Sequence, residues 1–357
     1  MKLVKMALLL GATWVPLFLL SFLSGRVLGE AVAKPFLHDP EANGRFLFVL
    51  PLLEFAGGVV GLSLSVQARH FLEMGLVPKE QAPRFQSIQA STIRWRESTI
   101  PEALILVLAY LIPLVTRVVL GMSAGDSSWE RVDSSITIAG WWNILVSLPI
   151  LYFFLLRWVW IYLLWGTFLF RVSRLDLDLT PTHPDRAGGL GFIAWGLASF
   201  ALVLMAISAT VSAGFADEIL NHGSSLNSLK MHVAIFVGVA FLILYAPLFS
   251  FSLRLAASRF QGLLQFGKLV WDHDKAFDEK WIKHASQNRD SLLGSADIQS
   301  LADAAAGYEH INEMWLVPFD MKAFAVLMIA ALLPMAPLLG TSVPLQEIFM
   351  KLGELLI

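Results

Sequence analysis

The chain has 357 residues, of which 56% are apolar and 15% are charged, whereas an ordinary globular domain has about 45–50% apolar and about 25% charged residues. The apolar residues are gathered into uncharged runs, several of them longer than the roughly 18 residues that can form a transmembrane helix. This composition excludes a soluble enzyme, a disordered chain and a nucleic-acid-binding protein, and the lack of short alternating segments argues against an outer-membrane barrel. The net charge of −2 indicates no strongly charged partner, and the absence of cysteine excludes disulfides and thiolate chemistry.

Residues 1–68 are predicted to contain the first two membrane spans, Met6–Gly25 and Phe46–Ala68. The basic residues before the first run resemble the start of a secretory signal. The run is longer than the about 7–15 apolar residues of a signal core, so we interpret it as a span. Residues 69–99 are predicted to form a cytoplasmic helical hairpin, because glycine and proline interrupt two helical patterns there.

Residues 100–257 are predicted to contain four more spans: Ile100–Leu120, Gly140–Phe170, Gly189–Ala213 and His232–Leu253. The second of these, at about thirty residues, overshoots a perpendicular crossing and should tilt or project from the bilayer. Residues 258–320 are predicted to form a cytoplasmic helical region. Residues 321–357 are predicted to contain the last span, Ala323–Val343, and an amphipathic helix in the outer interface.

Lysine and arginine predict the orientation of the chain. Most of the 26 Lys and Arg residues fall on the side that holds the N-terminus if seven spans cross. Such an excess is typical of the cytoplasmic side. The predicted fold is therefore an all-α, polytopic helical bundle in the lipid bilayer, with about seven spans, the N-terminus inside and the C-terminus outside.

Four ionisable residues within the predicted spans are candidate pathway residues: Glu54, Glu102, Arg117 and Arg157. A charge that faces lipid is costly, so each of them should face protein or water. One interpretation is an ion or solute pathway, with Glu54 and Arg157 near the middle, Glu102 at the cytoplasmic mouth and Arg117 at the outer one. The alternative is a structural Glu54–Arg157 pair that fixes helix register. In both cases the two side chains should lie within ion-pair or one-water distance.

The stretch before the fifth span holds the candidate catalytic residues His183, Asp185 and Arg186. His183 would act as general acid or base, with Asp185 orienting it. Backbone amides near Gly188 and Gly189, together with Arg186, would bind an anion or a phosphate group. The alternative is a rigid turn in which Asp185 caps the helix and the glycines allow close packing.

The remaining patterns give weaker indications of a functional site. Carboxylates and imidazoles in Trp271–Lys280, with His284 beyond, suggest a metal site, but the lysines among them are typical of a solvated helix face. Gly57, Gly58 and Gly61 are predicted to permit close helix contact. No metal or cofactor is predicted, since the sequence has no nucleotide-binding, nucleophile-elbow or zinc-helix motif.

Two segments resemble a group of polytopic inner-membrane proteins of bacteria for which no activity is established: PTHPDRAGGLGF at Pro181–Phe192 and LLGSADIQSLAD at Leu292–Asp303. The stretches WLVPFD and ALLPMAPLL extend this resemblance over most of the chain. The resemblance implies a location in the bacterial inner membrane, and it implies no activity or site residue.

Three functional hypotheses follow from the sequence. The first is a homo-oligomeric channel or transporter for a small ion or solute, since spans are dense and catalytic motifs are lacking. The second is an enzyme acting on a lipid or phosphorylated substrate at the cytoplasmic leaflet. The third is a signalling or assembly subunit whose cytoplasmic helices bind another protein. A polar path would favour the first, a pocket around His183 and Arg186 the second, and an exposed apolar patch on residues 258–320 the third.

Overall fold

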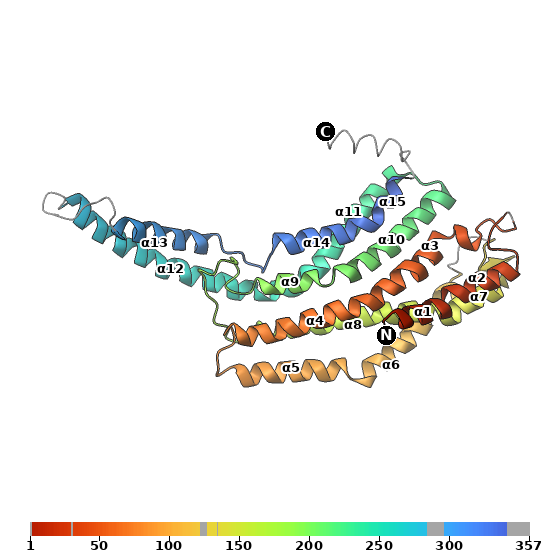
Figure 1. Ribbon diagram of the computed structural model, residues 1–357, viewed down its shortest axis with the longest axis horizontal. Helices are drawn as coiled ribbons and strands as arrows, with labels where there is room; N and C mark the ends of the chain where they lie inside the picture. The colour runs from red at the N-terminus through yellow and green to blue at the C-terminus, as the bar shows by residue number, and fades with distance from the viewer. Residues whose placement is uncertain (1, 30, 122–126, 134, 284–295, 341–357) are drawn as a thin grey trace.

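The computed structural model describes residues 2–29, 31–121, 127–133, 135–283 and 296–340, which form an all-α bundle with a short β-hairpin in one connecting loop (Figure 1). The α-helices are α1 Lys2–Ala12, α2 Trp14–Leu23, α3 Pro40–Asn43, α4 Leu50–Glu73, α5 Ala82–Arg96, α6 Thr99–Pro113, α7 Ile138–Trp142, α8 Leu148–Val172, α9 Phe192–Ala198, α10 Ala201–His222, α11 Leu226–Tyr245, α12 Ser252–Phe277, α13 Ala296–Asn312, α14 Met321–Leu332 and α15 Ala336–Leu339. The strands are β1 Arg131–Val132 and β2 Ser135–Ile136, which pair antiparallel. Short 3₁₀ or π-helical turns join several of these helices into longer rods.

Seven helical segments of the described chain are long and apolar enough to cross a bilayer. They are Val4–Leu23, Pro40–Glu73, Thr99–Val119, Ile138–Val172, Phe192–Asn221, Leu226–Lys283 and Met321–Leu339. This finding confirms the predicted all-α bundle with seven spans, and the chain is a multi-pass membrane protein. The orientation of its termini remains a prediction.

The second span is longer than its apolar run. It begins at Pro40, where Asp39 caps the first turn by accepting hydrogen bonds from the amides of Glu41 and Ala42. Its 34 residues correspond to about 51 Å of helix, whereas the hydrocarbon core is about 30 Å thick. This helix therefore tilts or projects from the bilayer, and the middle of the helix is not by itself the middle of the membrane.

The segment after α4 turns back along the bundle, as its glycine and proline predict. Gly75 has a φ of +73°, a conformation that favours glycine, and α5 follows at Ala82. The ring of Phe85 then lies 5.8 Å from the rings of both Phe71 on α4 and Phe168 on α8. This aromatic cluster fixes α5 against the ends of the two spans.

The sixth span continues as a single rod into α12. Pro247 lies in a 3₁₀ turn between α11 and α12, so the rod changes pitch there without ending. α12 and α13 pack side by side and extend past the other helices (Figure 1). Arg259 donates a hydrogen bond of 2.6 Å to the carbonyl oxygen of Asn312 at the base of this pair. α13 and most of α12 fall within residues 258–320, which are predicted to be helical.

The core lies among α4, α8 and α10, where the largest fully buried side chains include Phe46, Phe71 and Phe200. The span containing α10 is the most buried of the seven, and the span containing α11 is the least. The side chains of α11 therefore face mostly outward, which suits contact with lipid or with another chain.

Candidate functional site

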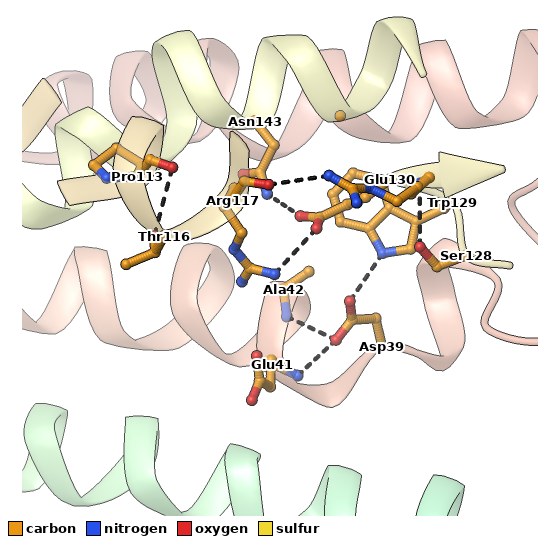
Figure 2. Close-up of polar contacts among 12 residues, drawn as sticks. Asp39, Glu41, Ala42, Pro113, Thr116, Arg117, Ser128, Trp129, Glu130 and Asn143 are labelled. Atoms are coloured by element: carbon orange, nitrogen blue, oxygen red, sulfur yellow. Dashed lines mark hydrogen bonds and ion pairs between the residues drawn. The ribbon is translucent and has the colours of Figure 1, made fainter. Parts of the chain in front are cut away.

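A cluster of buried charges lies at one end of the bundle, between the first two spans. The ammonium of Lys34 is 3.2 Å from a carboxylate oxygen of Asp39 and 2.5 Å from one of Asp217 on α10. All three residues are less than 10% exposed. The Trp129 indole nitrogen donates a 2.8 Å hydrogen bond to Asp39 (Figure 2). One lysine therefore neutralises carboxylates from two distant parts of the chain.

A second ion pair closes the other side of this cluster. The guanidinium of Arg117 lies 3.3 Å from the carboxylate of Glu130, which also accepts a hydrogen bond from the side-chain amide of Asn143 (Figure 2). Arg131 donates to the carbonyl oxygen of Arg117. Glu130 and Asn143 are buried, so these groups hold the β-hairpin loop against the third and fourth spans.

These charges surround a cavity of about 190 Å³, which we call the Lys34 cavity. Its lining comprises Lys34, Asp39, Glu41, Ala42, Arg45, Phe46, Arg117, Glu130, Asn143 and Asp217. Burial lowers the pKa of Lys34, but the carboxylates of Asp39 and Asp217 raise it more, so this pKa lies above its ordinary value. The lysine therefore stays charged at any physiological pH.

Of the residues that line the Lys34 cavity, the sequence predicted only Arg117 as a functional candidate, at the outer mouth of a pathway. It missed Lys34, Asp39 and Glu130 because short polar loops between spans are usually solvated. Asp217 fell just beyond the predicted fifth span, but the helix runs on to His222. A carboxylate in the last turns of an apolar helix was the signal that could have identified it.

A larger cavity of about 890 Å³ opens near Lys5, and we call it the Lys5 cavity. α4, α5 and α8 form its walls, and α1 contributes Lys5. Its charged lining residues are Lys5, Glu54, Arg69, Arg96, Glu97 and Arg157. The other lining residues are mainly apolar, among them Trp158, Leu164 and Phe168, so a basic rim surrounds an apolar wall.

Glu54 and Arg157 both line the Lys5 cavity, but they do not form a direct ion pair. The carboxylate of Glu54 lies 3.9 Å from the ammonium of Lys5, and no carboxylate of the described residues lies within 4.0 Å of the Arg157 guanidinium. Lys5 sits at the start of the first span, which begins at Val4. Glu54 therefore lies beside the beginning of that span, and its place near the middle of the membrane stays a prediction.

The remaining pathway candidate, Glu102, lines neither cavity. It lies exposed in the first turn of α6, where a carboxylate interacts favourably with the helix dipole. Among the described residues, no atom lies within 4 Å of a Cβ built at Gly57 or Gly61, so these two glycines make no close helix contact there. Both of these glycines line the Lys5 cavity instead.

An apolar layer separates the two cavities. It consists of Val49, Leu50 and Leu53 from the second span and Leu148 and Leu151 from the fourth, each at most 2% exposed. On the second span, Phe46 lines one cavity and Leu53 lines the other, and on the fourth span Asn143 and Phe154 do so. These separations are about 10–16 Å along a helix axis. The layer is therefore much thinner than the roughly 30 Å hydrocarbon core.

Two π-helical turns adjoin this layer, Gly44–Val49 in the second span and Asn143–Ser147 in the fourth. π-Helical turns recur at functional sites in proteins because their extra residue widens and reorients the local backbone. Both turns lie between the Lys34 cavity and the apolar layer, so the second and fourth spans have an irregular backbone at the same level of the bundle.

The turn before the fifth span is organised by Asp185. Its carboxylate accepts hydrogen bonds from the backbone amides of Ala187, Gly189 and Gly191 at 2.8–3.1 Å. The imidazole Nδ1 of His183 lies 2.8 Å from the same carboxylate. Asp185 itself thus occupies the amide of Gly189, one of those predicted to bind an anion, together with the amides of Ala187 and Gly191.

Arg186 is directed to the helical pair α12–α13 rather than to those amides. Its guanidinium lies 2.8 Å from the carboxylate of Glu313, and its carbonyl oxygen accepts a hydrogen bond from the amide of Trp315. A Cβ at Gly188 would lie 3.1 Å from Met314, so the glycine allows close packing there. This geometry favours the architectural interpretation of the turn, and His183 and Arg186 line neither cavity.

The Trp271–Lys280 segment holds no metal-type cluster within the described part of the chain. His273 contacts the hydroxyl of Ser300 on α13 at 3.1 Å, and His284 lies outside the described residues. Comparisons with protein-family models, curated proteins and solved structures found no match to this chain.

Proposed function

We propose that the protein is a channel or transporter that moves a small ion or solute between the Lys34 cavity and the Lys5 cavity. The observation that carries this proposal is that the second and fourth spans line both cavities, with only the thin apolar layer between them. Hydrophobic constrictions of this kind gate many membrane pathways. The two π-helical turns beside the layer give these spans a means of local adjustment.

The location and assembly of the protein are part of this proposal. The resemblance of the Pro181–Phe192 segment supports a bacterial inner membrane. The outward-facing apolar surface of α11 supports a homo-oligomer in which copies meet within the bilayer. An enzyme centred on His183 is less well supported, because the Asp185 carboxylate already serves three backbone amides.

Flux through the apolar layer tests the proposal. Proteoliposomes loaded with KCl or potassium phosphate should release at least one of K⁺, Cl⁻ and phosphate faster than protein-free vesicles. Leu50→Ala should increase this release, because it thins the layer. Leu62→Ala is the matched control, since Leu62 is 68% exposed on the same helix. Equal release by the two variants would contradict a path at Leu50.

Leu50→Ala is expected to lower the free energy of unfolding by about 2–5 kcal/mol. A second measurement covers the case in which this variant does not fold. The chain has no cysteine, so single cysteines can be introduced directly. A membrane-impermeant thiol reagent should reach Glu41→Cys from one side of the membrane and Gln89→Cys, in the lining of the Lys5 cavity, from the other. Labelling of both positions from the same side would contradict two opposed vestibules.

A further inference from the structure

The Lys5 cavity carries an excess of basic charge. Four basic and two acidic side chains line it. Glu54 pairs with Lys5, and Glu97 lies 2.9 Å from Arg96. Among the described residues, no carboxylate lies within 4.0 Å of Arg69 or Arg157. Two guanidinium groups are therefore available to a negatively charged ligand.

The wall of the cavity is apolar and has space beside the glycines. Trp158, Ile161 and Leu164 of α8 line one side. Opposite them, Gly57 and Gly61 of α4 leave open space where a Cβ would lie. A free inorganic anion would gain nothing from this wall, and an uncharged lipid would gain nothing from the guanidinium groups. A ligand with an anionic head and a hydrocarbon chain matches both features.

The cavity also lies where such molecules are abundant. The fifth span begins at Phe192, whose ring lies 4.9 Å from that of Phe71 on α4. The beginnings of spans lie at the level of the lipid headgroups, where Trp and Arg side chains are typical. Arg69 precedes Phe71 by two residues and lines this end of the cavity, and Gly61 and Gly57 lie between it and the apolar layer. A lipid of the surrounding leaflet can therefore enter the cavity with its phosphate at Arg69 and its chain directed toward that layer.

We propose that the Lys5 cavity binds an anionic phospholipid from the surrounding leaflet, with its phosphate at Arg69 and a hydrocarbon chain along Gly61 and Gly57. The lipid would complete the apolar wall of the vestibule that the proposed pathway uses. The inference uses the cavity of the proposed function, but it concerns binding and does not require that any solute be moved.

Lipid binding by the full-length chain tests this proposal. The purified protein is titrated in detergent micelles with phosphatidylglycerol, phosphatidylcholine or inorganic phosphate, and bound lipid is counted by native mass spectrometry while the melting temperature is recorded. Phosphatidylglycerol should bind and raise the melting temperature, whereas phosphatidylcholine and phosphate should have little effect. Arg69→Gln should weaken phosphatidylglycerol binding about tenfold, the equivalent of one charge-assisted contact.

A pair of filling variants separates the cavity from the general lipid surface. Gly61→Leu fills the cavity without a clash and should weaken binding by a similar factor. Gly238→Leu is the matched control, because Gly238 on α11 also has open space but lies outside the cavity. Arg94→Gln is the matched charge control, since exposed Arg94 does not line the cavity.

Several results would overturn the inference. Equal binding of phosphatidylglycerol and phosphatidylcholine would exclude recognition of the anionic head. Unchanged phosphatidylglycerol binding in both Arg69→Gln and Gly61→Leu would place the lipid elsewhere. Competition by phosphate at the lipid's own concentration would indicate a free-anion site. Efficient cross-linking between copies through Gly57→Cys would instead assign the glycine face to a second copy of the chain. A failure of the flux assay would leave these binding results unaffected.

Discussion

Removing the charge of Lys34 should destabilise the protein strongly. Lys34→Met keeps most of the side-chain volume but leaves Asp39 and Asp217 as neighbouring buried carboxylates. Breaking a buried ion pair by removing one partner costs about 3–5 kcal/mol, because the remaining charge is uncompensated. Lys34 contacts both carboxylates at 3.2 Å or less and is 7% exposed. We therefore expect a loss in this range in the free energy of unfolding, measured by chemical denaturation in detergent.

Two further variants make this test specific. Lys34→Met combined with Asp217→Asn should recover part of the loss, because one uncompensated charge is removed as well. Lys283→Met is the matched control: Lys283 pairs with Glu279 at 2.9 Å, but both side chains are 59% exposed. The control should leave stability nearly unchanged, since solvent screens exposed pairs. A loss in Lys34→Met no larger than that of the control would refute the reasoning.

The pH dependence follows from the direction of the Lys34 pKa shift. The carboxylates raise its pKa in the folded state. The stabilisation is therefore fully present below the unfolded-state pKa of about 10.4 and is lost only as the pH rises through the higher folded-state value. The difference in the free energy of unfolding between wild type and Lys34→Met should stay constant from pH 7 to 9.

Three other changes test the fold. Asp185→Ala removes the acceptor of three backbone amides and should cost at least about 2 kcal/mol in denaturation, whereas full stability would contradict an architectural role. Gly196→Ala should lower the melting temperature because its Cβ would overlap the side chain of Gln67, and adding Gln67→Ala should restore it. Reporter fusions test the orientation: we expect cytoplasmic signals after Arg96, Arg186 and Arg289 and periplasmic signals after Asp126, His222 and Ile357. A cytoplasmic signal at Ile357 would contradict the predicted orientation.

The spans were predictable because hydrocarbon imposes a simple condition on sequence. A helix that crosses it needs about twenty apolar residues, and seven segments of the described chain meet this condition. The helix ends were less predictable, since a helix continues where packing supports it. The second span runs to Glu73 instead of Ala68 because Phe71 packs against Phe85 and Phe192.

The Lys34 cavity was not predictable, because its charges come from segments far apart in the sequence. Asp39 and Trp129 are separated by 90 positions, and Asp217 arrives from a different helix. In each loop alone, such residues look like ordinary solvated charges. Only the antiparallel arrangement of the spans brings these loops to one end of the bundle, where burial forces the charges to pair.

The position of a charged residue within its own span also did not predict which other segments it contacts. Glu54 lies within a long helix, yet its contact with Lys5 puts it beside the beginning of another span. Arg117 lines the Lys34 cavity, where it pairs with Glu130. Three of the four charges that suggested a continuous polar line are therefore divided between two cavities, and the fourth, Glu102, lines neither. What lies between them is apolar, so any solute that passes must cross Leu50 and its neighbours, and the Leu50→Ala comparison addresses that step directly.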